Sequence, residues 1–290
     1  RGPCPCAWGP GTFWQLTQRG TCGGLRTRAS TSCTTTGGAV GQRAISGSAL
    51  TTCVELFCKH PRREKVQILI LACNRPTTLD LVLETWANVD GIAKTPITVS
   101  TDCRHVETED VVQKWQVEAP LKHLRLVHSF QADVVETGAQ VTDERVTRHW
   151  LSAVTHMFTN GAEHVIYAED DHVVTPDFLK SALRIIAAKE TLCSECFSIN
   201  MGCHGNCWGS RTEDSAAVMR MESGNMGVIY ERAKWEGFIS HRNTYCDILG
   251  DWDINLHIMG ALGKISPLAL TYLAPRIHHL TTCYSSRTQT

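Results

Sequence analysis

The sequence predicts an α/β fold in which helices cover both faces of a mostly parallel sheet. Three observations carry this prediction. Short apolar runs rich in β-branched residues begin at Val66, longer segments with apolar residues at helical spacing follow them, and the two kinds alternate along the chain. Helical connections between parallel strands are right-handed, so this alternation predicts one sheet between two helical layers. A chain of 290 residues is long enough to bury such a core.

The elements follow in order from Val66. The run "VQILILAC" predicts the first strand. The first helix is predicted within "RPTTLDLVLETWANVDG", because Leu79, Leu83 and Trp86 share one face and Gly91 can end it. Strand and helix patterns then alternate through "PITVSTD", "ETEDVVQKWQVE", "HLRLVHSF", "DERVTRHWLSAVTHMFTNG", "HVIYAEDD" and "PDFLKSALRIIAAKE".

The first 63 residues differ from the rest. They are rich in Gly, Thr, Ser and Cys and show no sustained period, so we predict an irregular extension before one domain over residues 64–290. The chain begins with Arg1 rather than Met, and no stretch approaches the roughly 18 apolar residues of a spanning helix. We therefore expect the native start, with any membrane anchor, to lie outside this chain.

Composition narrows the classes of partner. The net charge is -1, from 28 basic and 29 acidic side chains, so no long-range field favours nucleic acid or an anionic membrane. Fourteen cysteines are many for a cytosolic enzyme of this size. They predict a secreted or lumenal protein with disulfides, and the alternative is a zinc protein.

Polar residues follow three of the predicted strands. They are Asn74 and Arg75, Asp102, and an acidic run formed by residues 169–171. Ligands of open α/β sheets bind beyond the carboxyl ends of the strands, where these residues would meet. No G-x-x-x-x-G-K-[ST] motif occurs, and no G-x-G-x-x-G follows the first strand, which argues against a P-loop or a dinucleotide fingerprint.

The acidic run, Glu169, Asp170 and Asp171, points to a cation. Carboxylates held a few ångströms apart repel by roughly 1 to 4 kcal/mol, and a divalent ion removes that conflict. Oxygen ligands suit magnesium or manganese, which commonly share their coordination with substrate phosphates. The alternative is a solvated acidic turn that caps the helix starting near Thr175.

Six motifs carry a resemblance to a known family. In order along residues 66–283, they resemble those of the N-acetylglucosaminyltransferase II family, glycosyltransferase family 16. Its Golgi members add GlcNAc in β1,2 linkage to the α1,6-arm mannose of N-glycans. The motifs are "LACNRPTTLDLVLETW", "YAEDDHVVTPDF", "CSEC", "GNMGVIYERAKW", "GDWDINLHIM" and "PRIHHLTTC".

The resemblance implies a GT-A glycosyltransferase fold with a Rossmann-like sheet, UDP-GlcNAc as donor, a manganese ion, inversion at the anomeric carbon and a mannose-terminated N-glycan acceptor. It also implies a type II membrane protein of the Golgi lumen and a catalytic domain that is short at its C-terminus. The alternatives are transfer to the α1,3-arm mannose, since "AEDDHVVTPDF" is also close to N-acetylglucosaminyltransferase I, and an inactive lectin-like protein of the same fold.

The resemblance also implies donor-site roles. Asn74 and Arg75 fall where the family begins its nucleotide pocket, and Asp102 falls where it contacts the uridine. In the acidic run, Asp171 matches the direct metal ligand, while Glu169 and Asp170 are disposed toward sugar and ribose.

Two further roles come from the last motifs. Asp253 matches the catalytic base, and Asp251 is the competing candidate for that role. Without the resemblance, Asp251 is interpreted as the N-cap of a helix. His279 matches the second protein ligand of the metal, and His278, adjacent on a predicted strand, would point to the opposite face.

The segment "CSECFSINMGCHGNC" allows two interpretations. Its four cysteines, Cys193, Cys196, Cys203 and Cys207, have spacing that suits a structural zinc ion. The resemblance instead implies a disulfide within the C-x-x-C pair, and the other two cysteines could then pair with each other.

Overall fold

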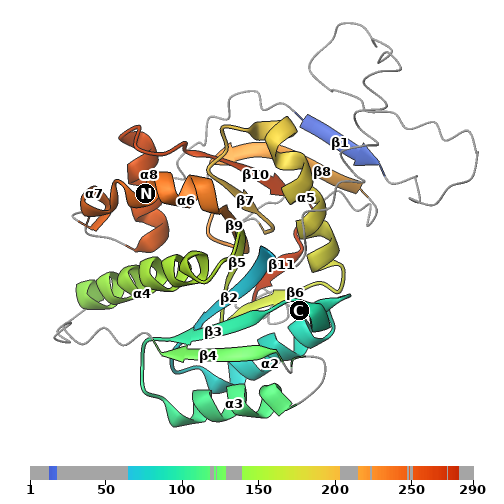
Figure 1. Cartoon of the computed structure of the whole chain (residues 1–290), viewed down its shortest axis with the longest axis vertical. Helices are drawn as coiled ribbons and strands as arrows, with labels where there is room; N and C mark the ends of the chain where they lie inside the picture. The colour runs from blue at the N-terminus through green and yellow to red at the C-terminus, as the bar shows by residue number, and fades with distance from the viewer. Residues whose placement is uncertain are drawn as a thin grey trace, which may run out of the picture.

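The computed structural model describes residues 13–17, 65–117, 121, 123–128, 139–202, 215–222, 224–246, 248, 251–272 and 274–280. Within these residues, nine strands form one sheet in the order β1-β8-β10-β7-β9-β5-β2-β3-β4 (Figure 1). Their bounds are β1 Phe13–Thr17, β2 Val66–Ala72, β3 Ile97–Thr101, β4 Leu124–His128, β5 His164–Glu169, β7 Ser198–Asn200, β8 Ser215–Glu222, β9 Val228–Glu231 and β10 Leu268–Tyr272.

A second, two-stranded sheet pairs β6 His172–Val174 with β11 Ile277–His279. The helices within the described residues are α2 Pro76–Ala87, the 3₁₀ turn η2 Ile92–Lys94, α3 Val106–Val117, α4 Ala139–Thr159, α5 Phe178–Cys193, α6 Arg232–Ile239, α7 Arg242–Cys246 and α8 Trp252–Ala261.

The predicted α/β fold with a mostly parallel sheet is confirmed. Neighbours β4, β3, β2 and β5 are all parallel, and β7 and β10 form another parallel pair. The sequence did not predict that β9, between β5 and β7, and β8, beside β10, run antiparallel to their neighbours. A strand that reverses needs no crossover helix, so it escapes a search for strand–helix alternation.

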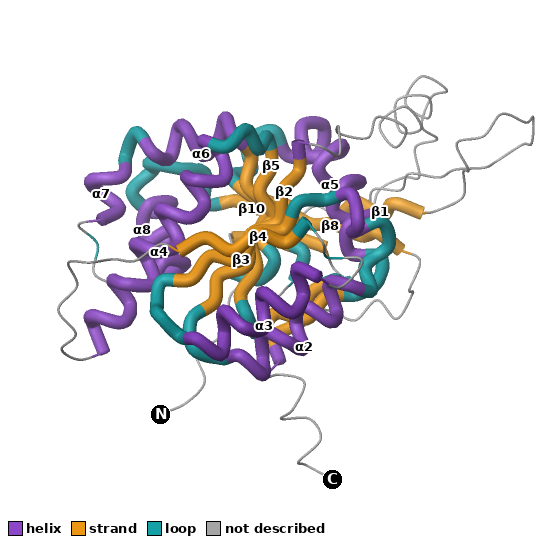
Figure 2. The backbone as a smooth tube through the Cα atoms, turned by 60° about the horizontal axis from the view of Figure 1, so that its bottom comes forward, coloured by secondary structure: helices purple, strands orange, loops and turns teal. Residues whose placement is uncertain are grey.

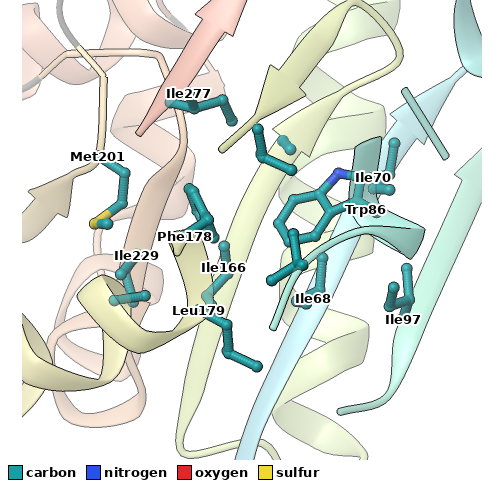
Figure 3. Close-up of a cluster of buried hydrophobic side chains, with 14 of the residues drawn as sticks. Ile68, Ile70, Trp86, Ile97, Ile166, Phe178, Leu179, Met201, Ile229 and Ile277 are labelled. Atoms are coloured by element: carbon teal, nitrogen blue, oxygen red, sulfur yellow. The ribbon is translucent and has the colours of Figure 1, made fainter. Parts of the chain in front are cut away.

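Helices cover both faces of the sheet, as predicted (Figure 2). On one face, α2, α3 and α5 pack on alternate strand residues such as Ile68, Ile70 and Ile166 (Figure 3). Trp86 of α2 meets Phe178 of α5 edge-on, with 5.0 Å between ring centroids. The period of two along β2 therefore divides its side chains between two cores.

On the other face, α4, α6, α7 and α8 pack against the alternate set of strand residues. Trp150 of α4 is the centre of this second core. Its ring stacks on that of Trp252 at 5.2 Å and meets Trp235 edge-on at 5.0 Å. The stacking joins α4 to the first residue of α8, and thereby fixes where α8 begins relative to the sheet.

Two predicted boundaries differ from the structure. The first helix ends at Ala87, not at Gly91, because Asn88 bonds back to Glu84 and Gly91 instead opens η2 with a left-handed φ of 81°. Helix α5 begins at Phe178 with Asp177 as its N-cap residue, later than a start at Thr175 would place it.

Part of the predicted N-terminal extension is a strand, because β1 pairs with β8 at the edge of the sheet. The rest of residues 1–63 lies outside the described residues. Among the helices that the structure describes, none has both the length and the apolar character needed to cross a bilayer.

Candidate functional site

A pocket of about 410 Å³ opens at the carboxyl ends of β2, β3 and β5. The strand register explains its place: Leu71 of β2 pairs with Glu169 of β5, and Ala72 pairs with Thr101 of β3. Residues that follow these pairs must therefore emerge at one level. Five of the predicted site residues line the pocket: Asn74, Arg75, Asp102, Glu169 and Asp170.

Arg75 bridges the acidic run. Nη1 of Arg75 donates to Oδ2 of Asp171 at 2.5 Å, and its Nη2 donates to Oδ1 of Asp170. The two carboxylates are only 2% (Asp170) and 4% (Asp171) exposed, so the interpretation as a solvated acidic turn is wrong. Burial raises the pKa of Asp170 to about 6, Arg75 lowers it in part, and the charge of Asp171 raises it again. The guanidinium therefore supplies part of the positive charge that the run requires.

Glu169 has a different environment from its neighbours. Burial raises the pKa of its carboxyl to about 7, with further contributions from the charges of Asp171, Asp170 and Asp251. The Tyr167 hydroxyl donates to Glu169 Oε1 at 2.7 Å and acts in the opposite direction. Proton uptake on this carboxyl near neutral pH is thus a second way in which the run limits its own repulsion.

Asp102 is held by α4. Arg145 donates from Nε to Asp102 Oδ2 and from Nη2 to the Asp102 carbonyl, both at 2.9 Å. His149, one turn further on, lies with Nδ1 3.8 Å from Asp102 Oδ1 and shares a 2.8 Å hydrogen bond between Nε2 and Ser100 Oγ. Burial lowers the pKa of His149 to about 4, against an opposing effect of Asp102.

Sequence reasoning missed Arg145 and His149, although both line the pocket. They lie four residues apart in the amphipathic α4, and that spacing puts them on one helix face. The available signal was this spacing of two polar residues in a helix that also carries the buried Trp150.

Asp171, His172 and His279 form a cluster of potential metal ligands. One ligand atom from each lies within 4.8 Å of the others. Nε2 of His279 is 3.0 Å from Asp171 Oδ2, whereas His278 pairs across the strands with Val173. Oδ1 of Asp171 is buried, and no hydrogen bond from a described residue reaches it. A carboxylate oxygen suits manganese, whereas an imidazole nitrogen suits zinc or iron, so this mixed set of donors fits a divalent transition metal.

His172 was missed by sequence reasoning. It lies opposite His279 in the β6–β11 register, and the ring centroids are 5.7 Å apart. Its Nδ1 accepts a hydrogen bond from the Glu169 backbone N–H at 3.1 Å, so the proton of a neutral ring must be on Nε2. A protonated Nε2 cannot ligate a metal, and in this arrangement His172 orients the acidic run instead.

Asp253 lies apart from the pocket, since it is not among the described residues that line it. It is the second residue of α8, and its Oδ2 accepts from Asn225 Nδ2 at 2.7 Å. Asp251 is the N-cap of α8, as its alternative interpretation predicted. The first residue of α8, Trp252, meets Tyr167 edge-on at 5.0 Å. Because Tyr167 lies in the strand that ends at Glu169, this contact packs the start of α8, and with it Asp253, against the strand that carries the acidic run.

Two disulfides are described. The predicted Cys193–Cys196 bond is confirmed, while Cys203 and Cys207 lie outside the described residues. The Cys73–Cys103 bond was not predicted, and it joins the loops that follow β2 and β3, with 5.3 Å between the Cα atoms. Two cysteines just past the ends of adjacent parallel strands were its sequence signal. The bond holds the two loops together at the rim of the pocket.

Two family models match the chain. The model of N-acetylglucosaminyltransferase II (MGAT2) matches residues 144–290, and the model of the GNT-I family matches residues 41–200. Both cover the acidic run, and the first also covers the segments that contain residues 225, 253 and 279.

Curated relatives share the name alpha-1,6-mannosyl-glycoprotein 2-beta-N-acetylglucosaminyltransferase. The protein of Arabidopsis thaliana is 22% identical over 228 residues, which is 67% of this chain and 53% of the relative. The protein of Homo sapiens is 23% identical over 125 residues, 41% of this chain and 28% of the relative. The chain thus spans about half the length of the first relative and less of the second.

Two solved structures are partly similar to this chain. Residues 1–349 of S. aureus TarS superpose with a TM-score of 0.46 at 15% identity, over 74% of this chain and 60% of that one. The mannosyltransferase PcManGT from Pyrobaculum calidifontis, in complex with GDP-Man and Mn²⁺, superposes with a TM-score of 0.43 at 11% identity, over 79% and 66%.

Proposed function

The chain belongs to the N-acetylglucosaminyltransferase II family and has the α/β sheet expected of its GT-A fold, and on this premise we propose that it transfers N-acetylglucosamine from UDP-GlcNAc, in β1,2 linkage, to the α1,6-arm mannose of N-glycans. The observation that carries the proposal is the meeting of Arg75, the acidic run and His279 beside a pocket at the strand ends. Because the chain spans 53% of the Arabidopsis relative, donor, acceptor and activity are all part of the proposal.

The nucleotide would occupy the pocket of about 410 Å³. Asp102, held by Arg145, would contact the uridine, and Asn74 and Arg75 would line the entrance to the nucleotide site. Glu169 and Asp170 would face the sugar and the ribose. Asp102, Glu169 and Asp170 accept hydrogen bonds when ionised, which suits the hydroxyl and N–H groups of a nucleotide sugar.

Asp171 and His279 would hold the manganese ion. The buried Asp171 Oδ1, which no described donor reaches, supports this assignment, as does the 3.0 Å between the two side chains. When bound, the ion would offset the negative charge that develops on the departing diphosphate. Arg75 already contacts Asp171 from the pocket side and would add a fixed positive charge there.

Asp253 would act as the general base. During inversion, the acceptor hydroxyl oxygen bonds to the anomeric carbon as that carbon's bond to the phosphate oxygen breaks, and UDP leaves with the bonding pair. The hydroxyl proton goes to the Asp253 carboxylate, which must face the attacking oxygen opposite the leaving group. Its place at the start of α8, outside the nucleotide pocket, suits an acceptor-side role.

A second candidate function is transfer to the α1,3-arm mannose. It is favoured by the match of the GNT-I family model to residues 41–200. For either acceptor we propose the Golgi lumen as the location, supported by the two disulfides among the described residues.

The test is a transfer assay with two N-glycan acceptors, one with only the α1,6-arm mannose free and one with only the α1,3-arm mannose free. Mass spectrometry detects the added GlcNAc, and linkage analysis identifies the position. Addition at O2 of the α1,6-arm mannose supports the proposal, and addition only to the α1,3 arm supports the second candidate. Glycan binding without transfer would replace both with a lectin-like function.

A further inference from the structure

We propose that Asn225 is a positioning residue for Asp253: its side-chain amide fixes the direction of the carboxylate that the proposed function makes the base. Nδ2 of Asn225 donates to Oδ2 of Asp253 at 2.7 Å, and the backbone N–H of Ile254 donates to Oδ1 at 2.7 Å. Each carboxylate oxygen therefore has a donor. Two donors from different parts of the chain prevent rotation of the carboxylate about its bond to Cβ.

The turn that carries Asn225 is itself closely packed. It connects β8 to β9 and is bounded by Gly224 and Gly227. A Cβ on Gly227, where φ is +59°, would lie 2.7 Å from Ile277 Cγ2, and a Cβ on Gly224 would lie 2.9 Å from Asn200 Nδ2. Glycine is required at position 227, where φ is positive and Ile277 is close, whereas at position 224 the close atom is the end of the Asn200 side chain. Asn225 thus projects from a turn with little freedom to move.

Backbone hydrogen bonds attach the same turn to the end of β7. The N–H of Met201 donates to the Gly227 carbonyl at 3.0 Å, and the N–H of Gly202 donates to the Met226 carbonyl at 3.2 Å. Ile277, which packs against Gly227, belongs to β11 and lies two residues before His279, in the core region shown in Figure 3. The packing of this turn against β11 therefore helps to position both Asp253, through Asn225, and His279.

The chemistry of an asparagine suits this role. A neutral amide donor stabilises an ionised carboxylate without adding charge, and a carboxylate oxygen that accepts one hydrogen bond keeps a second lone pair. That lone pair on Oδ2 of Asp253 can accept the acceptor's proton. An aspartate in place of Asn225 would offer no donor and would repel Asp253.

The proposal rests on the proposed function, and its test uses Asn225→Ala and Asn225→Asp, with Asn88→Ala as the matched control. Asn88 follows the last residue of α2, and within the described residues its hydrogen bonds go only to this helix, including one of 2.9 Å from its side chain to the Glu84 carbonyl. We expect Asn225→Ala to lower kcat about 10- to 100-fold and to move the acid limb of the pH–rate profile to higher pH, with Asn225→Asp lower still. Manganese-dependent UDP affinity should stay within about twofold of wild type.

An unchanged kcat and pH profile in Asn225→Ala would overturn the proposal, as would a loss of kcat matched by an equal loss of UDP affinity. If the wild-type chain transfers nothing, the proposed function fails, and carboxyl-¹³C NMR of labelled aspartate still tests the positioning. The Asp253 resonance, identified by its absence in Asp253→Asn, should shift in Asn225→Ala and stay in place in Asn88→Ala. A resonance that is the same in both variants would show that Asn225 does not position Asp253.

Discussion

Nε2 of His279 lies 3.0 Å from Oδ2 of Asp171, although His279 comes from β11, near the end of the described residues, and Asp171 follows β5. The pairing of β11 with β6 produces this contact, because the register sets His279 opposite His172, next to the acidic run. Adjacent strand residues point to opposite faces, so of His278 and His279 only His279 can reach Asp171.

The two histidines provide a matched pair of variants. His279→Ala should weaken manganese-dependent UDP binding by about 10-fold or more, because it removes one of the two proposed protein ligands. His278→Ala should change the affinity by no more than about twofold, since His278 is the cross-strand neighbour of Val173. Calorimetric titration of UDP with manganese present measures both, and equal losses would contradict the assignment.

Arg75→Ala should destabilise the chain by about 1–2 kcal/mol without metal, because it leaves the buried Asp170 and Asp171 without their cationic partner. The half-exposed position of Arg75 keeps this value below that of a fully buried pair. Manganese should recover part of the loss. Urea unfolding with and without manganese measures this effect. If manganese raises the free energy of unfolding of the variant no more than that of wild type, the ion and Arg75 do not neutralise the same carboxylates.

Acid should destabilise the fold through His149. Burial lowers its pKa from 6.5 to about 4, so between these values the unfolded chain binds a proton that the folded chain does not. The contribution of His149 is intact above pH 6.5 and is lost as the pH falls toward 4, by up to about 3 kcal/mol.

The control is His149→Gln, which can keep the hydrogen bond to Ser100 and has no charge to gain. Glu169 and Asp170 act in the opposite direction over the same range, because their raised pKa values make the folded chain bind protons, but they do so in both proteins. Urea unfolding should therefore show that the free energy of unfolding of the variant, relative to that of wild type, is higher at pH 5 than at pH 7.5. An unchanged difference between the two proteins would show that His149 does not contribute to the pH dependence.

Asp253→Asn and Asp251→Asn separate the two carboxylates at the start of α8. Asp253→Asn should retain UDP binding and lose transfer about 10²- to 10⁴-fold, the range for removal of a general base. Asparagine is as good an N-cap as aspartate, so Asp251→Asn keeps the cap of α8 and should stay active. Rate assays at saturating donor distinguish them, and the reverse pattern would transfer the role of base to Asp251.

The sequence allowed the fold to be predicted where its signals are local. Each apolar run from Val66 to Glu169 is a strand, and β2, β3 and β4 are each followed by a helix, whereas the short strand β6 comes between β5 and α5. These elements were predictable because periodicity records which face of each one is buried. The pocket residues at the strand ends were predictable for the same reason. Strands β8 and β9 were not, since antiparallel neighbours need no crossover to mark them.

Contacts made between distant elements could not be predicted. Arg145 and His149 reach Asp102 only because α4 packs over β2 and β5, and Asn225 reaches Asp253 only because a glycine-bounded turn lies beside α8. Arg75 was expected near the nucleotide, yet its pairing with Asp170 and Asp171 depends on the β2–β5 register. These relationships depend on tertiary packing, which residue spacing does not encode.

The proposed function requires that the chain bind a uridine nucleotide at a metal-dependent donor site. Calorimetric titration of UDP-GlcNAc and UDP into the folded chain, with and without manganese, tests it most directly, with GDP-mannose and the Asp171→Ala variant as controls. We predict binding that requires manganese, prefers uridine and is lost in Asp171→Ala. Absence of binding in a folded sample, or equal binding of GDP-mannose, would contradict it.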